Sequence, residues 1–253
     1  MLGAMAGPWI ENGLQRLSGE FITRQLGERQ LDRAGVGIVL LNSAVRKRVH
    51  DGQALRSEDF FRSDATSRSA ADEVAERAIL AMIAAIDEKQ IPFLANFYAS
   101  IYFSETVDQP NIPTLFALAE GLTYQGMCVI NVIASGVLYS GIARGHGEPK
   151  PWPIGDQILA RAIFDLRGMF LQIENGAEHA NALLDYDEID PSVMKLSLFG
   201  NLLFEMMGLS GISSNDSVLI GTRRSLERIA QSPLFGSDLA KIFTQATIDG
   251  GTC

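Results

Sequence analysis

Residues 154–173, IGDQILARAIFDLRGMFLQI, and residues 194–200, MKLSLFG, decide the fold, because the spacing of their apolar side chains changes along the chain. The first stretch begins with apolar residues at helical spacing and then passes into Phe170–Ile173, a run typical of a short β-strand. Met194–Leu196 is typical of a returning strand, and Leu198–Met207 of a helix. The pattern therefore predicts helix, strand, polar loop, strand and helix, in that order.

This order is the layout of a winged-helix unit, in which helices expected within 113–143 would be the first two of three. We place the winged-helix-like unit at about 113–208. A helical domain that carries a single β-hairpin is the alternative. The helix before the first strand is predicted to bury one stripe of side chains: Ile158, Ala162, Leu166 and Met169.

Toward the N-terminus the chain is predicted to form two helices, over about 9–30 and from there to Val49. The first is amphipathic, since its apolar residues follow one helical stripe: Ile10, Leu14, Leu17, Phe21 and Ile22. The second is expected to bury Ile38, Leu41, Val45 and Val49. We interpret residues 1–50 as an N-terminal helical arm and residues 51–253 as the body of the protein.

The body is predicted to be helical apart from the hairpin. Ser69 is expected to cap a helix over 70–88 that buries Ala71, Val74, Ala78, Met82 and Ala85. Further helices are expected over 91–103, 113–143, 198–207, 216–230 and 237–246. The expected fold class is mainly α: a multi-helix globular body with one small β-hairpin and an N-terminal helical arm.

Composition excludes several classes of protein. The chain has 253 residues, of which 47% are hydrophobic and 20% charged, so it is not intrinsically disordered. Two cysteines exclude a disulfide scaffold, and Cys128 is expected to be an inert buried thiol. The net charge of −9 makes nucleic acid an unlikely partner. Residues 1–70 nevertheless carry ten Lys and Arg against eight Asp and Glu, so the acidity lies in the rest of the chain.

The winged-helix-like unit has the wrong charges for DNA. Its would-be recognition helix offers Arg161 and Arg167 beside Asp156 and Asp165, and the loop over 174–190 carries six acidic residues and no cation. A DNA-reading helix needs several outward cations or amides, with phosphate contacts around them. We therefore expect any use of this shape to be a contact with protein.

No sequence motif indicates catalysis, a metal or a cofactor. G-x-S-x-G, H-E-x-x-H and G-K-[ST] are absent, and the Gly35–Gly37 segment lacks the third glycine of a dinucleotide fingerprint. Glu73 and Glu76 share a helix face and could form a carboxylate site, although a salt-bridged solvent face is the commoner meaning of this spacing. We predict no catalytic residues, no cofactor and no metal, and lean against an enzyme.

The main basic concentration is Arg46-Lys47-Arg48, which could contact an anion or an acidic partner. Arg56, Arg62 and Arg68 follow it, but acidic residues lie between them. Pairing with the acidic residues of the same protein is the alternative.

Three short segments carry a resemblance to a known group of proteins. They are Arg56-x-x-Asp59-Phe60-Phe61, Ser67–Glu73 and Glu88–Phe93, and the Leu122-Thr123-Tyr124 step fits the same pattern. Over about 10–210 the chain resembles uncharacterised bacterial helical proteins. The resemblance implies a bacterial cytoplasmic setting and association with accessory gene sets, phage-defence sets among them. It implies no activity or binding residue.

These observations favour a non-enzymatic interaction or regulatory protein that acts through helical surfaces and self-associates or binds a protein partner. The expected interaction helix carries Trp9, Leu14, Leu17 and Phe21. One alternative is a peripheral membrane protein that inserts the same helix, and another is an enzyme with an unrecognised carboxylate site. We expect a cytoplasmic protein, because the N-terminus lacks the basic residues of a signal peptide and the apolar stretch at 127–143 is too short and polar for a span.

Overall fold

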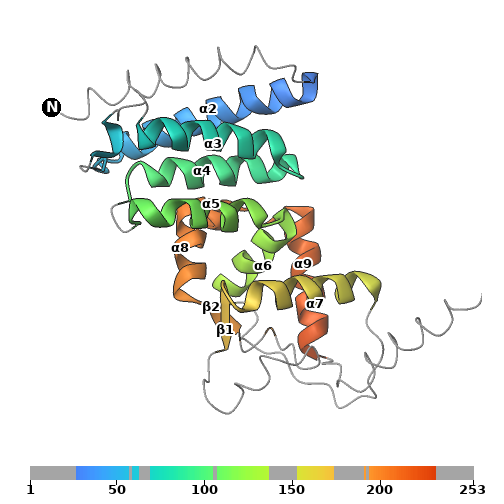
Figure 1. The fold of residues 1–253 in the computed structure, drawn as a ribbon. Helices are drawn as coiled ribbons and strands as arrows, with labels where there is room; N and C mark the ends of the chain where they lie inside the picture. The colour runs from blue at the N-terminus through green and yellow to red at the C-terminus, as the bar shows by residue number, and fades with distance from the viewer. Residues whose placement is uncertain are drawn as a thin grey trace, which may run out of the picture. The chain divides into compact units, whose positions relative to one another are not determined.

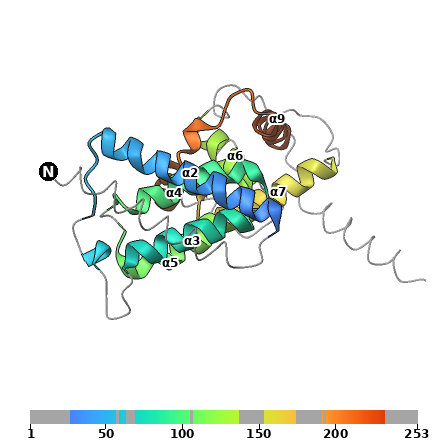
Figure 2. The same cartoon turned by 90° about the horizontal axis from the view of Figure 1, so that it is seen from above.

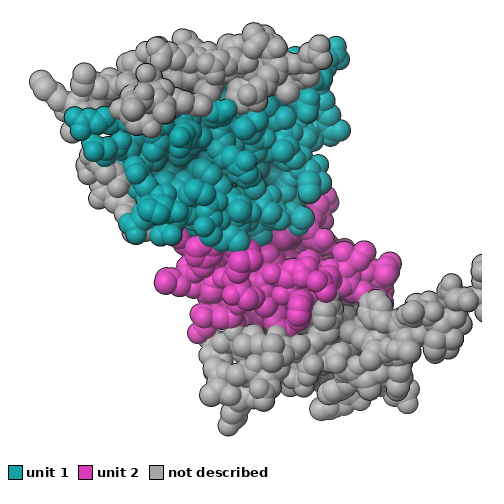
Figure 3. All heavy atoms as spheres, in the orientation of Figure 1, with its two compact units in different colours: residues 1–124, 205–208 teal, residues 125–204, 209–253 magenta. Residues whose placement is uncertain are grey.

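A computed structural model of the chain describes residues 27–56, 59–62, 69–104, 107–136, 153–173, 191 and 194–231. Within these ranges the protein is mainly helical, with one small antiparallel hairpin (Figure 1), so the predicted fold class is confirmed. The chain divides into two units (Figure 3). The first unit comprises residues 1–124 and 205–208, and the second comprises residues 125–204 and 209–253.

The first unit is built on helices α2 (Glu28–His50), α3 (Ala70–Ala84), α4 (Ile91–Ile101) and α5 (Ile112–Gly121). Short 3₁₀ turns, η1 (Asp59–Phe61), η2 (Glu88–Gln90) and η3 (Gln109–Asn111), precede α3, α4 and α5. Helices α2, α3 and α4 lie side by side and each contacts the other two (Figures 1 and 2).

Helix α3 begins where the sequence predicts. The Ser69 hydroxyl accepts a hydrogen bond from the Asp72 N–H at 3.2 Å, and the Asp72 carboxylate accepts one from the Ser69 N–H at 2.8 Å. The predicted inner face is confirmed, since all five of its residues are buried. The helix ends at Ala84 rather than at residue 88, because Asp87 and Gln90 cap a new 3₁₀ turn that leads into α4.

Helix α4 lies at the centre of the first unit, and eight of its eleven residues are buried. The rings of Phe97 and Phe116 meet edge to face at 6.2 Å, and Tyr98 lies 5.0 Å from Phe116. Aromatic pairs in these arrangements stabilise a core beyond the area that they bury. This packing holds α4 and α5 together.

The described part of the second unit contains α6 (Tyr124–Ala134), α7 (Ile154–Arg167), β1 (Leu171–Ile173), β2 (Met194–Leu196), α8 (Leu198–Met207), the 3₁₀ turn η8 (Leu209–Gly211) and α9 (Ser217–Gln231). Tyr124 and the last residues of α8 belong to the first unit. The predicted hairpin is confirmed: β1 and β2 pair antiparallel, with Leu171 opposite Leu196. Cys128 is buried in α6, as expected.

The step from β2 into α8 depends on Gly200. The Ser197 hydroxyl accepts a hydrogen bond from the Gly200 N–H at 2.9 Å, and the Ser197 N–H donates to the Phe170 carbonyl at 2.9 Å. A Cβ atom at position 200 would lie 2.1 Å from that carbonyl oxygen. Because the obstacle is backbone, only glycine fits between the strand and the helix.

The predicted inner face of α7 is correct at Leu166, which is buried, but wrong at Ile158 and Met169, and Ala162 is half-buried. Ile158 is 57% exposed and Met169 45% exposed, whereas the buried stripe begins one residue later, at Leu159, and continues through Ile163 and Leu166. Asp156 and Arg167 are buried on the same side as Leu159. Because these two charged residues lie on the buried face, the spacing of apolar residues in the sequence does not identify it.

The structure describes only part of the predicted N-terminal arm and only part of the predicted winged-helix-like unit. Residues 1–26, which include Trp9, Leu14, Leu17 and Phe21, lie outside the described residues. The rest of the arm forms α2, which packs on α3 and α4 within the first unit. The expected wing over 174–190 and the helix over 237–246 also lie outside the described residues, so the winged-helix-like unit stays a prediction.

Candidate functional site on the outer face of α2

Helix α2 has an inner face that fixes its rotation. Ala34, Gly37, Leu41 and Val45 are buried against α3 and α4. A Cβ atom at Gly37 would lie 2.7 Å from the Sδ atom of Met82, which is itself fully buried. The two helices therefore approach closely at this point, and α2 cannot turn about its axis without opening the contact.

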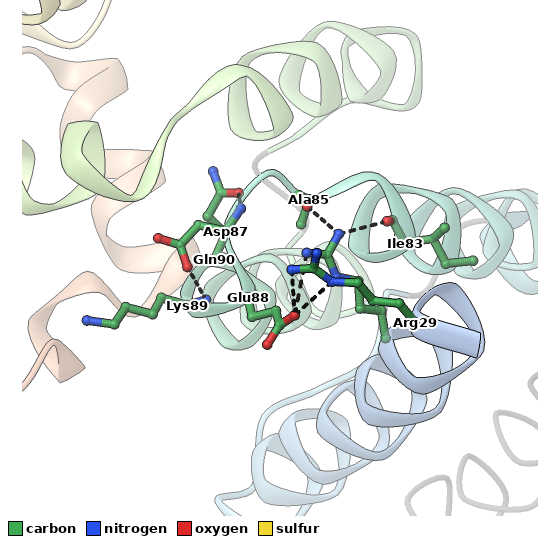
Figure 4. Close-up of polar contacts among 8 residues, drawn as sticks. Arg29, Ile83, Ala85, Asp87, Glu88, Lys89 and Gln90 are labelled. Carbon is green, nitrogen blue, oxygen red and sulfur yellow. Dashed lines mark hydrogen bonds and ion pairs between the residues drawn. The ribbon is translucent and has the colours of Figure 1, made fainter. Parts of the chain in front are cut away.

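Two arginines hold the N-terminal half of α2 on the C-terminal end of α3 and on the η2 turn that follows it; Figure 4 labels Arg29 and its partner Glu88. Arg33 donates hydrogen bonds from Nη1 to the Ala85 carbonyl at 2.7 Å and to the Ile83 carbonyl at 3.4 Å. Arg29 donates from Nη2 to the Glu88 carboxylate at 3.0 Å. The cation at position 33 satisfies carbonyls that the helix leaves unpaired and complements the negative end of its dipole.

Arg48 holds the C-terminal half of α2. Its Nη2 atom donates a hydrogen bond to the Ser100 hydroxyl at 2.5 Å, and that hydroxyl donates to the carbonyl of Asn96 or Met206, each 2.8 Å away. Burial lowers the pKa of the Arg48 guanidinium, although the nearby Asp51 carboxylate opposes this effect. Arg48 is therefore part of the packing of the first unit.

The opposite side of the helix, which we call the outer face of α2, is formed by Asp32, Gly35, Val36, Val39, Ser43 and Arg46, with Glu28 and His50 at its ends. All eight residues are exposed. Val39 is 67% exposed and Val36 is 53% exposed. The C-terminal half of the face, with Asn42 and Lys47, lines a shallow hollow of about 600 Å³.

The structure separates the three residues of the predicted basic cluster. Arg46 and Lys47 lie at the hollow, whereas Arg48 points into the first unit. Lys47 donates a hydrogen bond to Asp51 at 2.5 Å, and this bond lowers the pKa of the Asp51 carboxyl. The predicted contact site therefore reduces to two cations at the hollow: Arg46 on the outer face of α2 and Lys47 beside it.

The other arginines named in the sequence are not part of this site. Arg56 is buried and donates to the Val107 carbonyl at 2.9 Å, and Arg62 pairs with Asp59 at 3.3 Å. Arg161 of α7 pairs with Asp165 at 3.0 Å, and Arg167 is buried. Arg68 lies outside the described residues.

Arg77, which lies beside the suspected carboxylate pair of Glu73 and Glu76, binds a different carboxylate. Glu73 is exposed and Glu76 half-buried on α3, while the neighbouring Arg77 donates from Nε to Glu120 of α5 at 2.7 Å. Glu120 also accepts a hydrogen bond from the Tyr98 hydroxyl, and burial together with this carboxylate raises the pKa of Tyr98. The trio of Arg77, Tyr98 and Glu120 links three helices of the first unit.

No group of three or more His, Cys, Asp or Glu side chains that could hold a metal ion occurs among the described residues. A second hollow, of about 410 Å³, lies in the second unit between α7 and α9. At its wall the buried Asp156 carboxylate accepts two hydrogen bonds from Arg228, at 2.6 and 2.7 Å. These bonds lower the pKa of Asp156 and raise that of Arg228.

No single helix in the described part of the chain is both long and apolar enough to cross a membrane. The segments 109–121 and 124–134 reach that length and hydropathy only when taken together across the break between them. Within its own unit, each of the two segments buries most of its large apolar side chains.

Comparison with protein-family models, with curated proteins and with solved structures finds no match.

Sequence reasoning identified Arg46 and Lys47 but missed the apolar part of the outer face. Val36 and Val39 lie on a different side of the helix from Leu41 and Val45. This second group of apolar residues is the sequence signal that could have identified the exposed surface. A second signal is the order of charges, since Glu28 and Asp32 begin the face and Arg46 and His50 end it.

Proposed function

We propose that this chain is a non-enzymatic interaction protein of the cytoplasm, and that the outer face of α2 is its contact surface for protein. The observation that carries the proposal is the exposure of Val36 and Val39 on a helix whose rotation is fixed. Arg33 and Arg48 anchor the two halves of the helix, so the two valines cannot turn inward. Apolar side chains rimmed by charge on a rigid element are typical of protein contact surfaces.

The proposal is also supported by what the other polar groups do. Arg77, Tyr98 and Glu120 bind one another, as do Asp156 and Arg228, so these groups connect helices within their own units. The outer face of α2 differs from them because Arg46 and Lys47 lie at an open hollow that is also lined by the exposed Val39. Charge and apolar surface together give both steering and contact area.

Photo-crosslinking tests the proposal. A photoreactive phenylalanine analogue replaces Val39 in the full-length chain, and the matched control places it at Ile86, which is 84% exposed in the first unit but lies off α2. We expect a covalent adduct with protein, either a second copy or another chain, from position 39 and not from position 86. No adduct from position 39, or equal adducts from both positions, would contradict the proposal.

A membrane surface is the competing occupant of a face that combines valines with cations. Flotation with anionic phospholipid vesicles distinguishes the two, using the wild-type chain and Val39→Asp. We expect neither protein to float. Flotation of the wild type that is abolished by Val39→Asp would assign the outer face of α2 to lipid and overturn the protein-contact proposal.

A further inference from the structure

The outer face of α2 has a two-fold order of residue types. Val39 is its midpoint, because Asp32 and Arg46 each lie seven residues away, and Glu28 and His50 each lie eleven residues away. Separations of four, seven and eleven residues return to the same side of a helix. Acidic groups therefore stand at one end of the face, at the same distances from Val39 as basic groups at the other end.

This order makes the face complementary to itself when two copies run antiparallel. In a two-fold symmetric interface every contact occurs twice. If one residue of the first copy contacts a second residue of its partner, the same two residues also make contact with the copies exchanged. With Val39 on the axis, Asp32 of each copy faces Arg46 of the other, and Glu28 faces His50. A parallel arrangement would instead place like charges together, which is unfavourable.

The small residues of the face permit close contact. Gly35 and Ser43 each lie four residues from Val39, so they face each other in the antiparallel pair. A Cβ atom at Gly35 would meet no other atom within 4 Å, which leaves room for the backbone of a partner helix. Helix axes approach to about 8 Å when the residues at the crossing are small.

We propose that two copies of this chain associate along the outer face of α2, antiparallel and about a two-fold axis at Val39. This inference rests on the proposed function, in which the same face is the contact surface. A single helix face of 23 residues buries less than an interface of standard size. The dimer is therefore weak, with a Kd on the order of 10 μM, and salt weakens it further because its outer pairs are solvent-exposed.

Charge exchange tests the pairing in the full-length protein. Asp32→Arg places two arginines against each other in the homodimer, and Arg46→Asp does the same with two aspartates. Each variant alone is expected to sediment as a monomer at concentrations where the wild type dimerises. An equimolar mixture of the two variants is expected to form a heterodimer, because each contact then joins opposite charges. Arg62→Asp, an equal charge change at an exposed residue off α2, is the control and is expected to dimerise like the wild type.

A cysteine at the axis gives a second measurement. Val39→Cys, in a Cys253→Ser background, is expected to form a disulfide-linked dimer with diamide, whereas Ile86→Cys in the same background is not. A wild type that is monomeric at every concentration, or single variants that do not combine on mixing, would overturn the antiparallel pair. In that case, a photo-adduct from position 39 to a different protein would leave the proposed function standing. If neither a dimer nor a photo-adduct from position 39 forms, the proposed function is also wrong.

Discussion

Helices α2 and α7 are both amphipathic, but their buried faces are built differently. The inner face of α2 is apolar and small, and its arginines act at the edges of the contact. The inner face of α7 contains a buried carboxylate that is neutralised by Arg228 of α9. Each helix leaves apolar residues on its exposed side, Val36 and Val39 on α2 and Ile154 and Ile158 on α7.

An apolar stripe in the sequence therefore locates the buried face of a helix only where that face contains no charged side chain. In α2 the predicted Leu41 and Val45 are fully buried, while Ile38 and Val49 are half-buried. In α7 the same reasoning chose Ile158 over Leu159, because the ion pair of Asp156 occupies the true inner side. A paired charge can be buried at acceptable cost, and a sequence pattern does not display the pair.

The largest expected effect tests the inner face of α7 with two neighbouring residues. Leu159→Ala should lower the free energy of unfolding by about 3 kcal/mol, because it removes a fully buried side chain and leaves a cavity. Ile158→Ala should change it by less than about 0.5 kcal/mol, because that side chain is largely exposed. Urea denaturation measures both. Equal losses would show that the exposed position is covered.

The next effect is the difference between two glycine variants, and it tests the inner and outer faces of α2 with one substitution. Gly35→Ala should stabilise the protein by about 0.5–1 kcal/mol, because alanine favours a helix and meets no neighbour at this position. Gly37→Ala should destabilise it by about 1 kcal/mol, because the strain of overpacking against Met82 exceeds the same helical gain. Thermal unfolding of the two variants should shift in opposite directions. Two upward shifts would mean that Met82 yields without cost.

The ion pair of Asp156 and Arg228 should make the free energy of unfolding depend on pH in the acid range. The pKa of Asp156 is lowered in the folded protein, so the pair stabilises the fold above the unfolded value of about 3.9 and the contribution is lost as pH falls through the folded value. Asp156→Asn should cost about 1–2 kcal/mol at pH 7, less than a fully buried pair, because Arg228 is half-exposed. The difference between variant and wild type should shrink below about pH 4. A difference that does not depend on pH would exclude the carboxylate charge as its cause.

The smallest effect concerns the edge of α2. Arg33→Gln should cost about 1 kcal/mol, because Arg33 is largely buried and binds the last carbonyls of α3. Arg29→Gln is the matched control and should cost less than about 0.5 kcal/mol, since its ion pair with Glu88 is exposed. Chemical denaturation of the pair distinguishes a helix cap from a surface ion pair. Equal values would show that the bonds from Arg33 to the carbonyls at the end of α3 contribute no more than the exposed pair of Arg29 and Glu88.

The sequence by itself determined the helical class, the hairpin, the start of α3 and the alanine-rich inner face of that helix. These features follow from local rules: Ser69 and Asp72 lie three residues apart, as a capping box requires, and the change of apolar period at 170–196 is a property of the chain alone. The end of α3 was missed because the competing cap at Asp87 uses Gln90, which is anchored on the distant Leu122 carbonyl.

Only the tertiary structure decided which of the basic residues face solvent and which side of α2 is open. Arg46, Lys47 and Arg48 are consecutive, but successive residues of a helix point about 100° apart, so one of the three reaches Ser100 inside the first unit and two remain outside. Val39 stays exposed because Gly37 and Leu41 occupy the contact with α3 and α4. The candidate surface follows from how close α3 and α4 approach α2, which depends on residues far apart in the sequence.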